Sequence, residues 1–188
     1  MSLPVTSHFY RLQPFLMPTH VRRAVDESLS FVGELTEGSR LRVRSSGGDS
    51  FPIERLPVGT VNVTVDDGRE SGAMAASRAQ LVVHNYLGTS WLETLAMNIP
   101  TICFFDPTIY VPREAARPYV DSLTRVGILH HSGHDAARFV NSLNGDPSGW
   151  WNSSEVQEAR REFTARYANL SDEWLDAWII EFERMLSE

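Results

Sequence analysis

Residues 80–105 read QLVVHNYLGTSWLETLAMNIPTICFF and decide the fold class. Two short apolar runs, 80–84 and 101–105, have the length and the β-branched or aromatic content of buried strands. Residues 90–97 lie between them and have a helical composition. A strand, a helix and a second strand in this order predict a βαβ unit with parallel strands.

The same alternation continues on both sides of this unit. Apolar residues at helical spacing between Val21 and Leu35 predict a helix, which follows an expected strand at 8–12. Further strands are expected at 41–44, 61–65 and 127–129, with helices at 70–77 and 113–125, and a loop or short distorted helix over 47–59. The pattern predicts an α/β fold with a doubly wound parallel sheet. We expect about five or six strands, with 80–84 central because it is apolar throughout.

The C-terminal part is expected to be helical from about 150 to 188. Ser154 and Gln157 fit a capping box at its start. The apolar face of this helix is expected to contain Val156, Phe163, Tyr167, Leu170, Trp174 and Trp178. The length of 188 residues fits one Rossmann-like domain over 1–188.

Composition excludes several classes of partner and chemistry. The net charge is −7, from 24 acidic and 17 basic residues without a basic run, so nucleic acid and anionic membranes are poor partners. All 17 basic residues are Arg, which excludes a Schiff-base lysine and a phosphate-loop lysine. The sequence contains no transmembrane stretch and no signal-peptide pattern, so a cytoplasmic location is expected.

Cys103 is the single cysteine and cannot form a disulfide within the chain. It lies in the apolar run Ile102-Cys103-Phe104-Phe105. This position favours a buried core thiol over a nucleophile.

The candidate binding site is the loop 84–90, because ligands of doubly wound sheets bind where strands lead into helices. His84 and Asn85 end the strand, and Gly88, Thr89 and Ser90 lead into the helix. Free backbone N–H groups and the helix dipole favour a phosphate there. The two hydroxyls could donate further hydrogen bonds, and Gly88 permits close approach of the backbone.

Each of these residues also has a purely structural interpretation. Ser90 followed by Glu93 fits a capping box, which would explain both residues without a ligand. His84 could orient a ligand, or it could simply be hydrogen-bonded near the core.

Two clusters could suggest a metal, but neither fits well. Asp66 and Asp67 follow a strand and precede a glycine, so a turn or helix cap is favoured over a magnesium site. His130, His131 and His134 have no Cys or carboxylate at a defined zinc spacing and are expected in a solvated loop. No metal site is predicted.

Residues 80–102 resemble the donor-site segment of GT-B glycosyltransferases, in which a strand, a Gly/Thr/Ser loop and a helix with a glutamate precede a proline turn. Four further stretches resemble a bacterial family of transferase-like proteins found among surface-carbohydrate genes. They are NIPTI at 98–102, REAARPY at 113–119, VGILH at 126–130 and WWNSSEVQEAR at 150–160. The likeness runs from Phe9 to Trp178 and is strongest after Val65.

The resemblance implies the C-terminal domain of a two-domain GT-B enzyme, which holds a nucleotide-diphosphate sugar as substrate and needs no metal or other cofactor. Gly88, Thr89 and Ser90 would face the phosphates, and Glu93 the ribose hydroxyls. Arg42 or Arg44 could counter the phosphate charge, or both could be solvated strand charges. The N-terminal GT-B domain would be the partner on the same polypeptide, and it usually supplies the acceptor side and the general base. The start Met1-Ser2-Leu3 is expected to belong to an excised piece, and the isolated chain is expected to be inactive.

Two other function classes stay open at this point. One is a sugar-nucleotide epimerase or a glycerophosphate-type transferase with the same fold. The other is a non-catalytic interaction module that resembles GT-B. A pure interaction module should show no thermal shift with any nucleotide. The catalytic residues, the nucleotide base and the sugar do not follow from the sequence.

Overall fold

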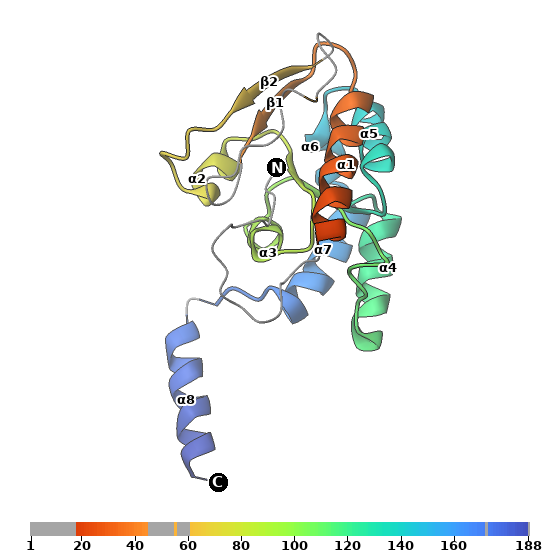
Figure 1. Ribbon diagram of the computed structural model, residues 1–188. Coiled ribbons are helices and arrows are strands. Elements are labelled where there is room, and N and C mark those ends of the chain that lie inside the picture. Colours follow the sequence, from red (N-terminus) through yellow and green to blue (C-terminus); the bar gives the residue numbers. More distant parts are fainter. Residues whose placement is uncertain (1–17, 45–54, 56–60, 172, 188) are drawn as a thin grey trace.

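Figure 1 shows the computed structural model of the chain, which describes residues 18–44, 55, 61–171 and 173–187. Helices and strands alternate along most of this length, as expected for an α/β protein. The strands are β1 (Arg40–Val43), β2 (Asn62–Val65), β3 (Val82–His84), β4 (Thr101–Phe104) and β5 (Leu129–His130). The α-helices are α1 (Pro18–Glu34), α2 (Gly72–Ser77), α3 (Thr89–Ala96), α4 (Arg117–Arg125), α5 (Gly133–Ser142), α6 (Pro147–Trp151), α7 (Ser154–Tyr167) and α8 (Trp174–Leu186). A short 3-10 helix, η2 (Glu114–Ala116), precedes α4.

All observed strand pairs are parallel, which confirms the predicted α/β class. The described strands form two sheets, however, with the orders β1-β2 and β3-β4-β5. The expectation of one sheet with 80–84 at its centre is therefore wrong for these residues, and the doubly wound arrangement stays a prediction. β3 is an edge strand and β4 is central. All four residues of β4 are buried, as a central strand requires. The expected strand at 8–12 and most of the expected loop at 47–59 lie outside the described residues.

Helices cover both faces of the three-stranded sheet, and β4 shows why. Ile102 and Phe104 point to one face, where they pack with Phe31 of α1 and Ala136 of α5. Cys103 points to the other face, where the core is built from α3, α4 and α7 through Trp91, Leu95, Leu123, Phe163 and their neighbours. Because alternate side chains of a strand point to opposite faces, an entirely apolar strand needs a helix layer on each side.

The smaller sheet is joined to this body through α1. Val43 is fully buried in a cluster with Val25 and Leu29 of α1. Leu41 and Val63 also pack against the core that contains Ile102 and Phe104. In Figure 1 the two strands β1 and β2 lie at the upper left of the body, next to α2.

The C-terminal part is helical as expected, but it is not one continuous helix. α7 ends at Tyr167 and α8 begins at Trp174, so the predicted apolar face divides. Val156 and Phe163 are buried, whereas Leu170, Trp174 and Trp178 are exposed. Figure 1 shows α8 extending away from the body. The predicted capping box is also wrong, because Ser153 is the N-cap and makes no side-chain capping bond.

Cys103 is fully buried in the core, which confirms its interpretation as a core thiol. Its Sγ lies 3.3 Å from the carbonyl oxygen of Tyr86. Burial raises the pKa of this thiol well above its usual value, so the thiolate is disfavoured. Among the described helices, none is both long and apolar enough to cross a membrane.

Candidate functional site

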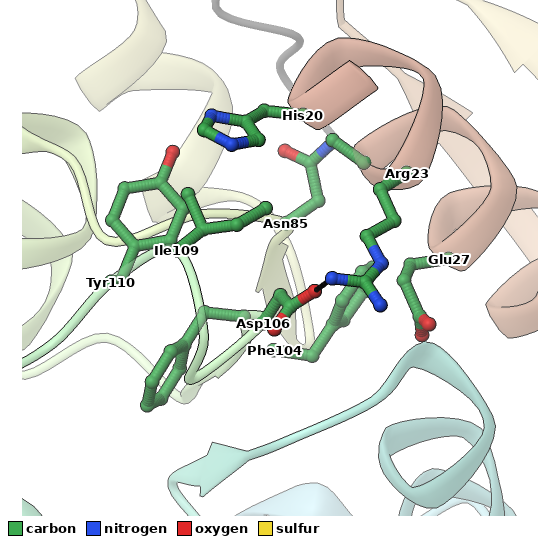
Figure 2. Close-up of a pocket in the computed structure, with 10 residues that line it drawn as sticks. His20, Arg23, Glu27, Asn85, Phe104, Asp106, Ile109 and Tyr110 are labelled. Atoms are coloured by element: carbon green, nitrogen blue, oxygen red, sulfur yellow. Dashed lines mark ion pairs between the residues drawn. The ribbon is translucent and has the colours of Figure 1, made fainter. Parts of the chain in front are cut away.

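A small hollow lies at the carboxyl ends of β3 and β4, on the side covered by α1 (Figure 2). β3 ends at His84 and is followed by Asn85, and β4 is followed by Phe105 and Asp106. α1 contributes His20, Arg23, Ala24 and Glu27, and the loop after β4 contributes Ile109 and Tyr110. The cavity volume, counted as the space open to the centre of a water molecule, is about 20 Å³, so the hollow has room for a small polar group.

Asn85 is the most informative residue of this hollow. It is only 4% exposed, and its side-chain amide nitrogen donates to Oγ of Ser28 at 3.1 Å. The Ser28 hydroxyl in turn donates to the carbonyl oxygen of Ala24 at 2.6 Å, so it can only accept from Asn85. These two hydrogen bonds fix the orientation of the amide. Its oxygen, Oδ1, is buried and has no partner among the described residues.

An ion pair lies beside Asn85 in the hollow. Nη1 of Arg23 lies 2.7 Å from Oδ2 of Asp106, the contact that is dashed in Figure 2. The other oxygen of Asp106 accepts from the backbone N–H and the hydroxyl of Thr108, at 2.8 and 2.6 Å. Burial raises the pKa of Asp106, but the Thr108 hydrogen bonds and the Arg23 charge outweigh it and hold the pKa below its usual value. Asp106 is therefore a carboxylate at neutral pH.

Glu27 and Tyr110 complete the polar lining. Oε2 of Glu27 accepts from the backbone N–H of Gly133 at 2.6 Å, which joins α1 to the start of α5. Burial raises the pKa of Tyr110, so its hydroxyl stays protonated and can act as a donor. The hollow thus combines one unpartnered acceptor with charges that already have partners.

The second polar feature is the start of α3, on the other side of the carboxyl end of β3. Gly88 is the N-cap, and no side chain caps the helix. Within the described residues, the backbone N–H groups of Thr89 and Ser90 have no hydrogen-bond acceptor, and both side chains are exposed. Two free N–H groups at the positive end of a helix dipole favour an anion.

The capping-box interpretation of Ser90 and Glu93 is wrong. The helix begins one residue earlier, at Thr89, which places Ser90 inside the first turn. Glu93 is exposed and forms no ion pair or side-chain hydrogen bond with the described residues. Helix capping therefore does not account for these two residues. Their predicted contacts with phosphate and ribose stay predictions.

His84 has a structural role in the core. Its Nε2 lies 3.1 Å from the hydroxyl of Thr94, and that hydroxyl donates to the carbonyl oxygen of Trp91 at 3.0 Å. Because a hydroxyl has one hydrogen, Nε2 must be the donor in the pair. Burial lowers the pKa of His84 to about 4, so it is neutral at physiological pH. Hydrogen bonding in the core, the alternative to a ligand contact, accounts for this residue.

Arg42 in β1 and Arg44 directly after it both pair with acids, and Arg42 is also exposed to solvent. Nε of Arg42 lies 3.1 Å from Oδ2 of Asp66, and Nη1 of Arg44 lies 3.3 Å from the same oxygen. Arg42 also pairs with Glu70 at 3.2 Å, and Arg44 donates to the Glu70 carbonyl oxygen at 2.6 Å. Arg42 is thus exposed, as expected for a solvated strand charge, whereas Arg44 is only partly exposed. A phosphate role for either arginine stays a prediction, and it would compete with Asp66 and Glu70.

The turn at Asp66 and Asp67 is confirmed. Oδ1 of Asp66 accepts from the Gly68 N–H at 2.7 Å, and Oδ1 of Asp67 accepts from the Arg69 N–H at 3.1 Å. The hydrogen bond from Gly68 and the charges of Arg42 and Arg44 hold the pKa of Asp66 below its usual value.

The predicted solvated loop of histidines is only partly correct. His130 lies in β5 and is partly buried, and its Nε2 lies 2.9 Å from the carbonyl oxygen of Gly127. Burial lowers its pKa. His131 and His134 are exposed. Across the described ranges, no three His, Cys, Asp or Glu side chains gather as metal ligands would.

Sequence reasoning found Asn85 but missed the other polar residues of the hollow. Asp106 carried a usable signal, because it is the first charged residue after a buried strand, where ligands of parallel sheets bind. Arg23 carried none, because its ion pair joins residues that lie far apart in the sequence.

Comparison with known proteins assigns the chain to a family. No curated protein and no solved structure gives a significant match to the chain. The model of a family described as "LIC12162 family transferase" matches residues 2–182. Because the match spans nearly the whole sequence, this chain belongs to the LIC12162 family of transferases.

Proposed function

We propose that this chain binds the nucleotide-diphosphate sugar of a glycosyltransferase that makes bacterial surface carbohydrate. Its membership of a transferase family supports a group-transfer reaction over an epimerase or a purely structural module. Helices on both faces of a parallel sheet support a ligand at the carboxyl ends of the strands. The proposal includes a GT-B N-terminal domain on the same polypeptide as the partner, and the cytoplasm as the location.

The uncapped start of α3 is the observation that carries this proposal. The N–H groups of Thr89 and Ser90 are free donors among the described residues. A diphosphate bound there would gain from the helix dipole. The same donors would stabilise the negative charge that develops on the nucleotide diphosphate as it leaves. Glu93, one turn further along α3, would accept from the ribose hydroxyls.

The decisive variant removes a single N–H group of this helix start. Thr89→Pro does so, because proline lacks an N–H and is well tolerated at the first position of a helix. Gly88 already has the extended backbone, with φ −120° and ψ 179°, that a following proline requires. Thr89→Ala is the matched control, because it removes the hydroxyl and keeps the N–H. Gly88→Val is less suitable, because its Cβ would lie 2.7 Å from Cζ of the Tyr86 ring.

Titration calorimetry with uridine and guanosine diphosphates would test the site. We expect Thr89→Pro to weaken binding roughly 10-fold or more, as the loss of a hydrogen bond to a charged group. Thr89→Ala should bind within about threefold of wild type. Glu93→Ala should lose roughly 1 to 3 kcal/mol of binding energy if it contacts the ribose. Thermal melts of each variant would identify any that merely unfold.

Two outcomes would refute the proposal. If Thr89→Pro is folded and binds as tightly as wild type, the diphosphate does not lie on α3. If the wild-type chain binds neither diphosphate, the chain is not a donor-binding domain of this kind. We also expect the isolated chain to transfer no sugar, so turnover of a nucleotide sugar by this chain alone would contradict its need for an N-terminal domain.

A further inference from the structure

The unpartnered oxygen of Asn85 needs a hydrogen-bond donor. A buried carbonyl oxygen without a partner costs roughly 1 to 3 kcal/mol, so nearly all such groups in folded proteins are paired. The amide cannot turn over to relieve this, because Ser28 holds its nitrogen. In Figure 2 the oxygen points toward the side of the hollow where His20, Ile109 and Tyr110 lie. Oδ1 has almost no exposed surface, so a ligand group that enters from that side would reach it by displacing the lining side chains slightly.

The chemistry of the hollow selects the kind of group that it could hold. Oδ1 of Asn85 only accepts, so a phosphate or carboxylate oxygen would be repelled there. The cavity has room for a hydroxyl. Phe104, Phe105 and Ile109 provide apolar lining beside the polar groups. A hydroxyl attached to a carbon ring fits this combination of one acceptor and apolar walls.

We propose that the hollow between α1 and the loop after β4 is a subsite for a carbohydrate hydroxyl, which donates to Oδ1 of Asn85. The inference rests on the proposed function and deepens it. Asn85 and Thr89 are four positions apart in the sequence, so their Cα atoms lie no more than about 14 Å apart. One nucleotide-diphosphate sugar could therefore place its diphosphate on α3 and a hydroxyl in the hollow. The hydroxyl could come from the ribose or from the transferred sugar.

Calorimetry with UDP, UDP-glucose, GDP and GDP-mannose tests the subsite and identifies the source of the hydroxyl. Asn85→Leu removes the acceptor and keeps a side chain that branches at the same atom. Asn141→Leu is the matched control, because it removes another amide that hydrogen-bonds α1, at Glu34 and away from the hollow. We expect Asn85→Leu to weaken binding about 5- to 10-fold and Asn141→Leu to stay within about twofold of wild type. A loss with the sugar nucleotides alone assigns the hydroxyl to the transferred sugar, and an equal loss with the diphosphates assigns it to the ribose.

A second measurement needs no variant and stays informative if Asn85→Leu fails to fold. The side-chain NH₂ resonances of Asn85 in the ¹⁵N-labelled wild-type chain should shift when the same ligands bind. If ligands bind but these resonances do not move, or if a folded Asn85→Leu binds like wild type, the subsite is overturned and the diphosphate site on α3 still stands. The hollow would then hold only a water molecule. If wild type binds none of the four ligands, both proposals fail together.

Discussion

Gly133 is the position where one added methyl group should disturb the body of the protein most. It is the first residue of α5 and lies against the backbone of α1. A Cβ at this position would overlap the carbonyl oxygen of Glu27, and it would lie 2.9 Å from the carbonyl carbon of that residue and 3.1 Å from the N atom of Phe31. All three contacts are with backbone atoms, so no side chain can move aside. Gly133→Ala therefore forces α1 and α5 apart.

The structure supplies a matched control for this substitution. Gly72 is also the first residue of a helix, and it also follows a serine N-cap: Ser71 accepts from the N–H of Met74, as Ser132 does from that of Asp135. A Cβ at Gly72 would meet nothing within 4 Å. Gly72→Ala should therefore show only the general gain from replacing a helical glycine, at most about 0.5 to 1 kcal/mol.

The expected loss follows from the difference between the two sites. Overpacking costs roughly 1 to 3 kcal/mol, so Gly133→Ala should lower the free energy of unfolding by about that amount, less the general gain seen at Gly72. For a chain of this length this corresponds to a fall in Tm of roughly 2 to 4 °C for each kcal/mol. Urea unfolding followed by tryptophan fluorescence, together with thermal melts, measures both variants. If Gly133→Ala is as stable as Gly72→Ala, α1 and α5 do not approach as closely as described.

Two further predictions concern buried ionisable groups. The pKa of His84 is about 4 in the folded chain and near 6.5 when unfolded. The contribution of neutral His84 to the free energy of unfolding is therefore fully present above pH 6.5. Up to about 3 kcal/mol of this free energy should be lost as the pH falls toward 4. His84→Gln should make the fall in unfolding free energy between pH 7 and 5 less steep. An unchanged slope would refute a buried neutral His84. Asp66→Asn should cost about 2 kcal/mol, because this carboxylate is 1% exposed and pairs with Arg42 and Arg44. The neighbouring Asp67→Asn should change stability by no more than about 0.5 kcal/mol, because Asp67 and its partner Arg69 are both exposed. Equal losses in thermal melts of the two variants would contradict the stabilising role of Asp66.

Local patterns predicted the elements well where the signal lay within one segment. The apolar run at 101–105 became β4, and the helical segments after it and before it became α4 and α3, with boundaries shifted by a residue or a few. The sheet order could not be predicted in the same way. The run at 80–84 has an apolar centre like that of β4, but whether a strand is central depends on its neighbours on both sides, and these come from distant parts of the chain.

The candidate site was also predicted only where its residues lie close together in the sequence. The start of α3 was visible in the sequence, because a glycine and two hydroxyl residues follow a strand. The hollow was not, because α1 brings Arg23 to Asp106 only after the chain has folded. The break between α7 and α8 was also missed. Apolar residues at helical spacing on both sides predicted one continuous helix, and only the few polar residues between them indicated a break.

The full burial of Cys103 has a practical consequence for site-specific labelling of this protein. The chain has no second cysteine, and a thiol with a raised pKa in a packed core reacts slowly with maleimides. Any cysteine placed on the surface would therefore be the one site that such a reagent modifies in the folded protein. A spin label at exposed Ser90, paired with one at exposed Val111, could report how the start of α3 and the loop after β4 respond to a nucleotide, with no need to mutate the native thiol first.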